Sequence, residues 1–319
     1  MMISFSSMCA MLSQNDRIAI LTHKRPDGDT LGSAAALCLG LRKIGKRAWL
    51  FPNPEVTQKY KPMTDGLWAE EGESFGFICT VDVADKALLT DNAFEKLNRI
   101  DLAIDHHPSF TGFGGAGYCD PSAAACGEII YALLDGMECR LDSGIADAIY
   151  TAIATDTGCF SFDNTTATTH SVAAACFEAG ADYREINYRC FRLKTRARVA
   201  LEGHLYSSLA MVSEGRGAVS MITRDLLQTL GATEDDTDNL ASLLTQIEGV
   251  KIGALLTEMP DQGGFKISMR GRSGFNVSEI CALFGGGGHA GAAGCTLENM
   301  NARDAENTIK KVIGDRLDA

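Results

Sequence analysis

The chain has 319 residues, a formal net charge of −12 and 45% hydrophobic residues, which is enough for one large or two ordinary globular domains. The acidic balance argues against sequence-independent binding of long duplex nucleic acid, because such binding needs a basic surface. No segment approaches the ~20 consecutive apolar residues of a membrane helix, so we expect no membrane association.

The first two thirds of the chain alternate strand-like and helix-like segments. Aliphatic and β-branched runs predict strands at 17–23, 47–51, 75–85 and 99–107. Alanine- and leucine-rich patterns predict helices at 1–12, 30–46, 122–136 and 146–158. This alternation predicts an α/β N-terminal domain over residues 1–190, with a mostly parallel sheet flanked by helices. In such sheets, ligands bind beyond the carboxyl ends of the strands.

The pattern changes near residue 190. Residues 191–204 are more basic and predict a helical linker. Residues 205–319 predict a smaller C-terminal α/β domain, with the active site in the cleft between the two domains. The expected strands of this second domain are 217–223, 250–259 and 264–271, and its expected helices are 236–248, 276–284 and 302–315.

Carboxylates and imidazoles stand where the apolar runs of the first domain end. They are His23, Asp27, Asp29, Asp82, Asp105, His106, His107 and Asp156. Alone, each fragment is typical of a turn or a helix cap, and Gly28 is expected to let the backbone bend between two aspartates. Together, however, these residues follow four apolar segments whose ends should lie at one edge of the sheet, and this arrangement predicts a site for two divalent metal ions. Clustered carboxylates would otherwise repel one another, and a donor set of oxygens and imidazoles suits manganese or magnesium.

Two glycine-rich stretches, 112–117 and 286–291, fit the spacing G-x-G-x-x-G. Neither follows a first strand and opens a helix, so neither predicts a dinucleotide site. We expect a loop at 112–117. In the second stretch, the backbone N–H groups of Gly286, Gly287 and Gly288 ahead of His289 are able to cradle a phosphate or a terminal sugar. The alternative is a tight turn into a closely packed helix.

Two arginines precede the second glycine-rich stretch. Arg270 and Arg272 suit phosphate binding, because a guanidinium matches phosphate geometry. The alternative is solvated surface charge.

Five segments, in this order, resemble the motifs of the DHH phosphoesterase superfamily and its DHH-associated C-terminal domain. They are "HKRPDGDTLGS", "VDVAD", "IDHHPS", "ATDTGCFSF" and "SMRGRSGFNVSEICALFGGGGHAGAAG". The resemblance covers nearly the whole chain. Its compact length is similar to that of the nanoRNase and oligoribonuclease type, which also removes a phosphate from 3′-phosphoadenosine 5′-phosphate (pAp).

The resemblance implies a role for each motif residue. One manganese would be held by His23, Asp27 and Asp82, and the other by Asp29, Asp82, His106 and Asp156, with magnesium or cobalt as alternatives. Asp105 would orient a neighbouring ligand, and His107 would contact the phosphate or assist the leaving oxygen. Arg270, Arg272, Gly286, Gly287, Gly288 and His289 would bind the nucleotide.

Two departures from the family pattern follow the first two motifs. Thr30 replaces a more usual alanine and is expected to cap the following helix. The segment 86–90 lacks the usual arginine and glycine, which leaves the substrate contact of that loop open.

The resulting expectation is a manganese-dependent phosphoesterase in which a metal-held hydroxide attacks the phosphorus of short oligoribonucleotides, pAp or both. Cyclic or linear dinucleotides and polyphosphate are alternative substrates, and a non-catalytic nucleotide-binding protein is a third reading. The expected partner is a short single-stranded RNA or a nucleotide phosphate, without long duplex nucleic acid or membrane. A homodimer remains open. Eleven cysteines without a C-x-x-C pair indicate reduced thiols in the cytoplasm.

Overall fold

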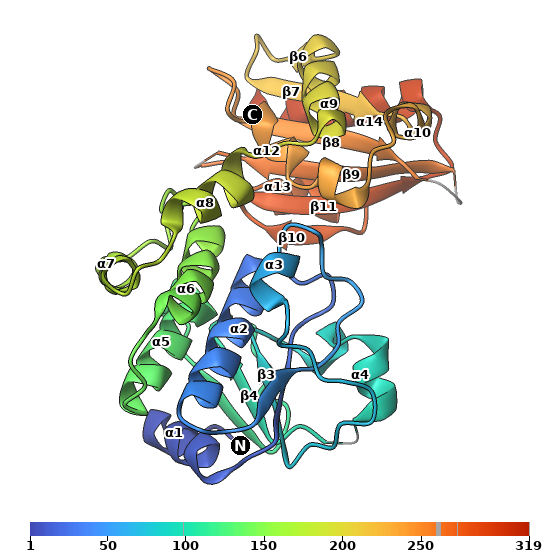
Figure 1. Cartoon of the computed structure of the whole chain (residues 1–319). Helices are drawn as coiled ribbons and strands as arrows, with labels where there is room; N and C mark the ends of the chain where they lie inside the picture. The colour runs from blue at the N-terminus through green and yellow to red at the C-terminus, as the bar shows by residue number, and fades with distance from the viewer. Residues whose placement is uncertain (98, 260–262, 273, 319) are drawn as a thin grey trace. The chain divides into compact units, whose positions relative to one another are not determined.

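The computed structural model describes residues 1–97, 99–259, 263–272 and 274–318. The chain divides into two compact units, Met1–Leu193 and Lys194–Ala319 (Figure 1). Among the described residues, no helix has both the length and the apolar character that crossing a membrane requires.

The first unit is built on a parallel sheet, as the alternation of strand and helix patterns predicted. Within the described residues the sheet has five strands in the order β2-β1-β3-β4-β5, and every neighbouring pair is parallel. The strands are β1 (Ile18–Leu21), β2 (Ala48–Leu50), β3 (Phe77–Val81), β4 (Leu102–Asp105) and β5 (Ala116–Cys119). The expected loop at 112–117 leads into β5, whose four residues carry too little pattern to stand out in the sequence.

Helices cover the first sheet. They are α1 (Phe5–Gln14), α2 (Gly28–Lys43), α3 (Lys61–Thr64), α4 (Asp91–Lys96), α5 (Cys126–Gly136), α6 (Ser143–Asp156), α7 (Ala167–Glu178) and α8 (Tyr183–Asn187). A short turn, η1 (Lys86–Leu88), follows β3, and a π-helical turn, η2 (Tyr188–Arg192), follows α8. The main core joins one face of the sheet to α1, α2, α5 and α6, and a smaller apolar cluster joins the other face to α4.

The second unit has a mixed sheet between two layers of helices. Its strand order over the described residues is β10-β11-β9-β8-β7-β6, and only β7 and β8 run parallel. The strands are β6 (Ala210–Val212), β7 (Gly217–Ile222), β8 (Ile252–Glu258), β9 (Gly264–Gly271), β10 (Gly287–His289) and β11 (Ala292–Glu298). The helices are α9 (Arg196–Ser207), α10 (Arg224–Leu230), α11 (Glu234–Thr237), α12 (Leu240–Leu244), α13 (Val277–Ala282) and α14 (Ala302–Leu317).

Three parts of this unit differ from the sequence-based expectation. The glycine-rich stretch 286–291 forms β10 and the turn into β11, so the alternative of a turn into a helix is wrong. The expected helix 236–248 is divided into two short helices, α11 and α12. The segment 191–204, expected as a helical linker, is helical from Arg196 onward as part of α9, and Leu201 and Leu205 of that helix are fully buried in the second unit.

Candidate metal centre

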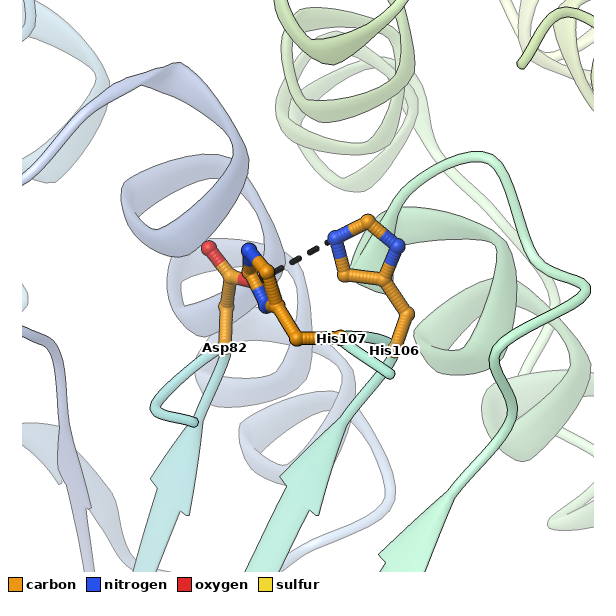
Figure 2. A group of neighbouring side chains, drawn as sticks. All are labelled: Asp82, His106 and His107. Atoms are coloured by element: carbon orange, nitrogen blue, oxygen red, sulfur yellow. Dashed lines mark ion pairs between the residues drawn. The ribbon is translucent and has the colours of Figure 1, made fainter. Parts of the chain in front are cut away.

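The predicted ligand residues converge at the carboxyl edge of the first sheet. His23 follows β1, Asp82 follows β3, and His106 and His107 follow β4. Figure 2 shows β3 and β4 pointing toward the three labelled side chains, with an ion pair between Asp82 and His106. Strand order reverses between β1 and β3, and sheets of this order bind ligands at that reversal.

The first group of donor atoms contains His23, Asp27 and Asp82. Nε2 of His23 lies 3.7 Å from Oδ1 of Asp27 and 3.8 Å from Oδ2 of Asp82. Nδ1 of His23 lies 2.8 Å from the carbonyl oxygen of Lys24, which directs Nε2 to the carboxylates. Burial lowers the pKa of the His23 imidazole, but the neighbouring negative carboxylate of Asp27 outweighs burial, so the pKa is raised.

The second group is centred on His106. Its Nε2 lies 3.6 Å from a carboxylate oxygen of each of Asp29, Asp82 and Asp156. Nδ1 of the same ring lies 3.1 Å from the carbonyl oxygen of Ala123, which fixes the ring orientation. Asp82 therefore borders both groups, with Oδ2 toward His23 and Oδ1 toward His106.

Asp82 is held in an unusual backbone conformation. Its φ is 60°, a left-handed value that aspartate tolerates better than most residues with a side chain. The residue is buried, and Oδ1 has no hydrogen-bond partner among the described residues. Burial and the negative charges of Asp29 and Asp27 raise the pKa of this carboxyl well above its ordinary range. Such a carboxylate requires either a proton or a cation.

Asp29 joins the centre to the start of α5. Its carboxylate accepts hydrogen bonds from the N–H groups of Cys126 (2.7 Å) and Gly127 (3.0 Å), the first two residues of α5, and from the Ser33 hydroxyl (2.8 Å). The N-terminus of a helix favours such a negative charge. Burial and the charge of Asp156 nevertheless raise the pKa of Asp29 well above its ordinary range. The contact of Ser33 with Asp29 was not predicted from the sequence, although Ser33 is a polar residue one helical turn after Asp29 in an apolar run.

Asp105 holds the turn that presents the two histidines. Its Oδ1 accepts hydrogen bonds from the N–H groups of His106 (2.7 Å) and His107 (3.1 Å) and from Nδ1 of His107 (2.8 Å). The bond to Asp105 raises the pKa of His107, whose side chain is 44% exposed. Oδ2 of Asp105 is buried without a hydrogen-bond partner in the described part of the chain. The contact between Asp105 and Nδ1 leaves Nε2 of His107 available for a ligand.

Close packing of α2 against α6 brings Asp156 to the centre. Asp156 is the last residue of α6, and Gly28 is the first residue of α2. A Cβ on Gly28 would lie 2.4 Å from Oγ1 of Thr155, and one on Gly32 would lie 2.5 Å from the carbonyl oxygen of Ala148. Gly28 has no positive φ, so the expectation that it serves a backbone bend is wrong. It is required because α6 passes too near for any side chain.

Thr30 does not cap α2, contrary to expectation. Asp27 is the cap, since its Oδ1 accepts hydrogen bonds from the N–H groups of Asp29 (3.0 Å) and Thr30 (3.1 Å). The buried hydroxyl of Thr30 instead donates to the carbonyl oxygen of Val81 (2.9 Å), one residue before Asp82. It therefore ties the start of α2 to the end of β3.

The donor atoms fit divalent cations. Separations of 3.6–3.8 Å are too long for hydrogen bonds, yet they are close to the spacing of two ligands on one ion at about 2.1 Å each. His23, Asp27 and Asp82 form one compact group of donors, and Asp29, His106 and Asp156 form another. Oδ1 of Asp82, which has no hydrogen-bond partner among the described residues, lies 3.6 Å from Nε2 of His106 and 3.4 Å from Nδ1 of His107 and offers the second group a further oxygen.

The predicted nucleotide-binding residues of the second unit lie on β9 and on the β10–β11 hairpin. Arg270 is half-buried, and burial lowers the pKa of its guanidinium, whereas Arg272 and His289 are exposed. A Cβ on Gly286 would lie 2.2 Å from the carbonyl oxygen of Gly294, and Gly288 has a φ of 143°. The fold of the hairpin thus requires these two glycines. A Cβ on Gly287 would meet no described atom within 4 Å, so this position is open to a ligand.

Sequence comparison assigns both units to known domain families. Residues 17–153 match the DHH family, N-terminal domain, and residues 216–316 match the DHHA1 domain. The chain belongs to the DHH family of phosphoesterases. The bifunctional oligoribonuclease and PAP phosphatase NrnA of Thermus thermophilus is 29% identical over 94% of this chain and 90% of its own.

Solved structures agree on the fold. An exopolyphosphatase-related protein from Bacteroides fragilis superposes with a TM-score of 0.85 at 21% identity, over 98% of this chain and 95% of the other. RecJ of Thermus thermophilus, crystallised in complex with Mn²⁺, superposes with a TM-score of 0.51 at 13% identity, over 98% of this chain and 54% of the other.

Proposed function

We propose that this DHH-family enzyme is a manganese-dependent phosphoesterase that hydrolyses short oligoribonucleotides, pAp or both. The observation that carries the proposal is the convergence of three carboxylates and two imidazoles on Asp82, whose buried Oδ1 has no hydrogen-bond partner among the described residues. The NrnA relative of Thermus thermophilus, which matches nearly end to end, supports the choice of substrates. The RecJ structure with Mn²⁺ supports the choice of metal.

The two groups of donors would hold two divalent ions. His23, Asp27 and Asp82 would hold one, and Asp29, His106 and Asp156 would hold the other, with Asp82 shared. When bound, such ions polarise a phosphoryl oxygen and make a water molecule more acidic. The carboxylates would supply the negative charge that balances the two ions, and the hydrogen bonds to Asp29 and His106 hold these side chains in the orientation that binding would need.

His107 is proposed to hold the proton for the leaving oxygen. Its Nδ1 donates to Asp105, so Nε2 is the ring nitrogen that faces a ligand. The raised pKa of His107 favours the protonated ring, which is able to donate a proton from Nε2. Arg270, with Arg272, His289 and the glycines at 286–288, is proposed to bind the nucleotide.

A substrate panel with manganese tests the proposal. It contains pAp, a dinucleotide, a longer RNA, cyclic-di-AMP and polyphosphate. We expect turnover of pAp or of the dinucleotide to exceed that of the other substrates, and a chelator to abolish it. Faster turnover of polyphosphate or cyclic-di-AMP would contradict the substrate assignment, and full turnover in excess chelator would contradict the metal mechanism.

A further inference from the structure

One face of the second sheet is open over β11 and over the part of β9 that α12 does not contact. Along β9, Phe265, Ile267 and Met269 point into the core formed with α13 and α14, whereas Lys266 and Arg270 point to the opposite face. On that opposite face, α9 and α12 cover β7 and β8 through an apolar cluster. The side chains of β9 and β11 on this face are half-buried or exposed.

The open face carries two basic groups, the exposed Lys266 and the half-buried Arg270, and the negative charge of Asp238 acts on Arg270. Neither Lys266 nor Arg270 forms a salt bridge with a carboxylate of the described residues. The guanidinium of Arg270 donates to the carbonyl oxygen of Met269 (3.0 Å). Glu298, which is exposed, lines the same cavity as Lys266. A half-buried guanidinium without a salt bridge among the described residues favours an anionic ligand.

Strand register places small and hydroxyl-bearing residues beside these cations. Lys266 pairs with Thr296, and Ser268, midway between Lys266 and Arg270, pairs with Gly294. A cavity of about 690 Å³ is lined by Lys266, Thr296, Gly294 and Gly286, among others. The cavity therefore extends from the glycine-rich hairpin to Lys266, near the start of β9. Its volume lies within the range of ligand pockets.

We propose that Lys266 and Thr296 form a subsite for a second phosphate of an oligonucleotide whose end is held at Arg270. This inference rests on the proposed function and deepens it. Alternate residues on a strand are about 6.7 Å apart, so Lys266 and Arg270 are separated by about 13 Å along β9. A single strand rises about 3.4 Å per nucleotide when stacked, and more when extended, so a few nucleotides span this distance.

The residues of the subsite are suited to select substrates by the number of nucleotides and not by base sequence. Lysine binds phosphate as a point charge, and the hydroxyls of Ser268 and Thr296 are able to donate to phosphate oxygens. A mononucleotide held at Arg270 leaves Lys266 unused. The subsite therefore favours substrates of a few nucleotides over pAp.

Kinetics of Lys266→Ala test the inference in the full chain with manganese. We expect the ratio of KM for a trinucleotide to KM for pAp to rise about tenfold, and the salt dependence of the trinucleotide KM to fall by about one charge. Lys311→Ala, an exposed lysine on α14, is the matched control and should leave the ratio unchanged. Arg270→Ala should raise KM for both substrates.

An unchanged ratio in Lys266→Ala would overturn the subsite, even if the enzyme hydrolyses both substrates. Failure of the wild-type enzyme on both substrates would instead refute the proposed function. In that case, fluorescence anisotropy with a labelled trinucleotide still tests Lys266, since binding should weaken about tenfold in Lys266→Ala and not in Lys311→Ala. Equal binding by the wild type and both variants would again overturn the subsite.

Discussion

Replacement of Asp82 by asparagine separates the effect of metal binding from that of folding. The substitution removes one negative charge and keeps the shape of the side chain. Asparagine also tolerates the left-handed backbone, so the φ of 60° adds no strain. Because Oδ1 has no hydrogen-bond partner among the described residues, no hydrogen bond to that atom is lost, and only its ion pairs with His106 and His107 are weakened.

The expected effect has opposite signs with and without metal. In chelator, burial and neighbouring carboxylates raise the pKa of Asp82, so its charged form destabilises the folded, metal-free protein. The neutral asparagine therefore leaves the metal-free protein as stable as the wild type or more stable. With manganese at about 100 times its Kd, the wild type gains about 2.7 kcal/mol. At about 2–4 °C per kcal/mol for a unit of this size, its Tm rises by about 5–11 °C.

Thermal unfolding in chelator and in saturating manganese measures both effects. We expect Asp82→Asn to lose most of the manganese-induced rise in Tm, and its turnover to fall by at least about 10³, or about 4 kcal/mol of barrier. Asp135→Asn, an exposed aspartate on α5, is the control and should keep the full rise. If Asp82→Asn keeps the wild-type rise and a rate within about threefold, Asp82 is not a shared metal ligand.

Three further predictions concern the packing and titration of the centre. Gly28→Ala should lower the free energy of unfolding by about 1–3 kcal/mol in urea melts, because the new methyl group overlaps Thr155. Adding Thr155→Gly should restore stability. An unchanged urea midpoint in Gly28→Ala would mean that α2 and α6 are able to move apart without a loss of stability. Thr30→Val should lower the free energy of unfolding by about 1 kcal/mol in the same assay, because it removes the hydroxyl that donates to Val81. Thr30→Ser keeps a hydroxyl and should be close to the wild type in stability. Equal stability of the two variants would rule out a contribution from this hydrogen bond. The pKa of His23 lies above the ordinary histidine value of about 6.5. Manganese affinity, measured by calorimetry, should therefore fall as the pH drops through this raised pKa, because a proton competes with the ion for the ring nitrogen. A manganese affinity that does not change between about pH 6 and 8 would argue against His23 as a ligand.

The local pattern was sufficient to predict most elements of the first unit and to select the acids and histidines that the fold brings together at one sheet edge. Alternation of apolar strands with helices indicated the parallel sheet, and the acids and histidines at the run ends indicated its functional edge. Parallel strands present their carboxyl ends on one side, so residues far apart in sequence meet there. Short elements such as β5 and β10 were missed, because three or four residues carry too little periodicity.

The sequence by itself determined which side chains are available to bind metal and phosphate, since residue type sets charge and donor atoms. Only the tertiary structure decided how each is held. The approach of α6 to α2 explains Gly28, and the start of α5 explains the hydrogen bonds to Asp29. Alternation along β9 already places Lys266 and Arg270 on one face, but the neighbours of this face on β11 and the helices that leave it uncovered come only from the tertiary structure. These relations depend on contacts between distant segments, and a local pattern of residues does not contain them.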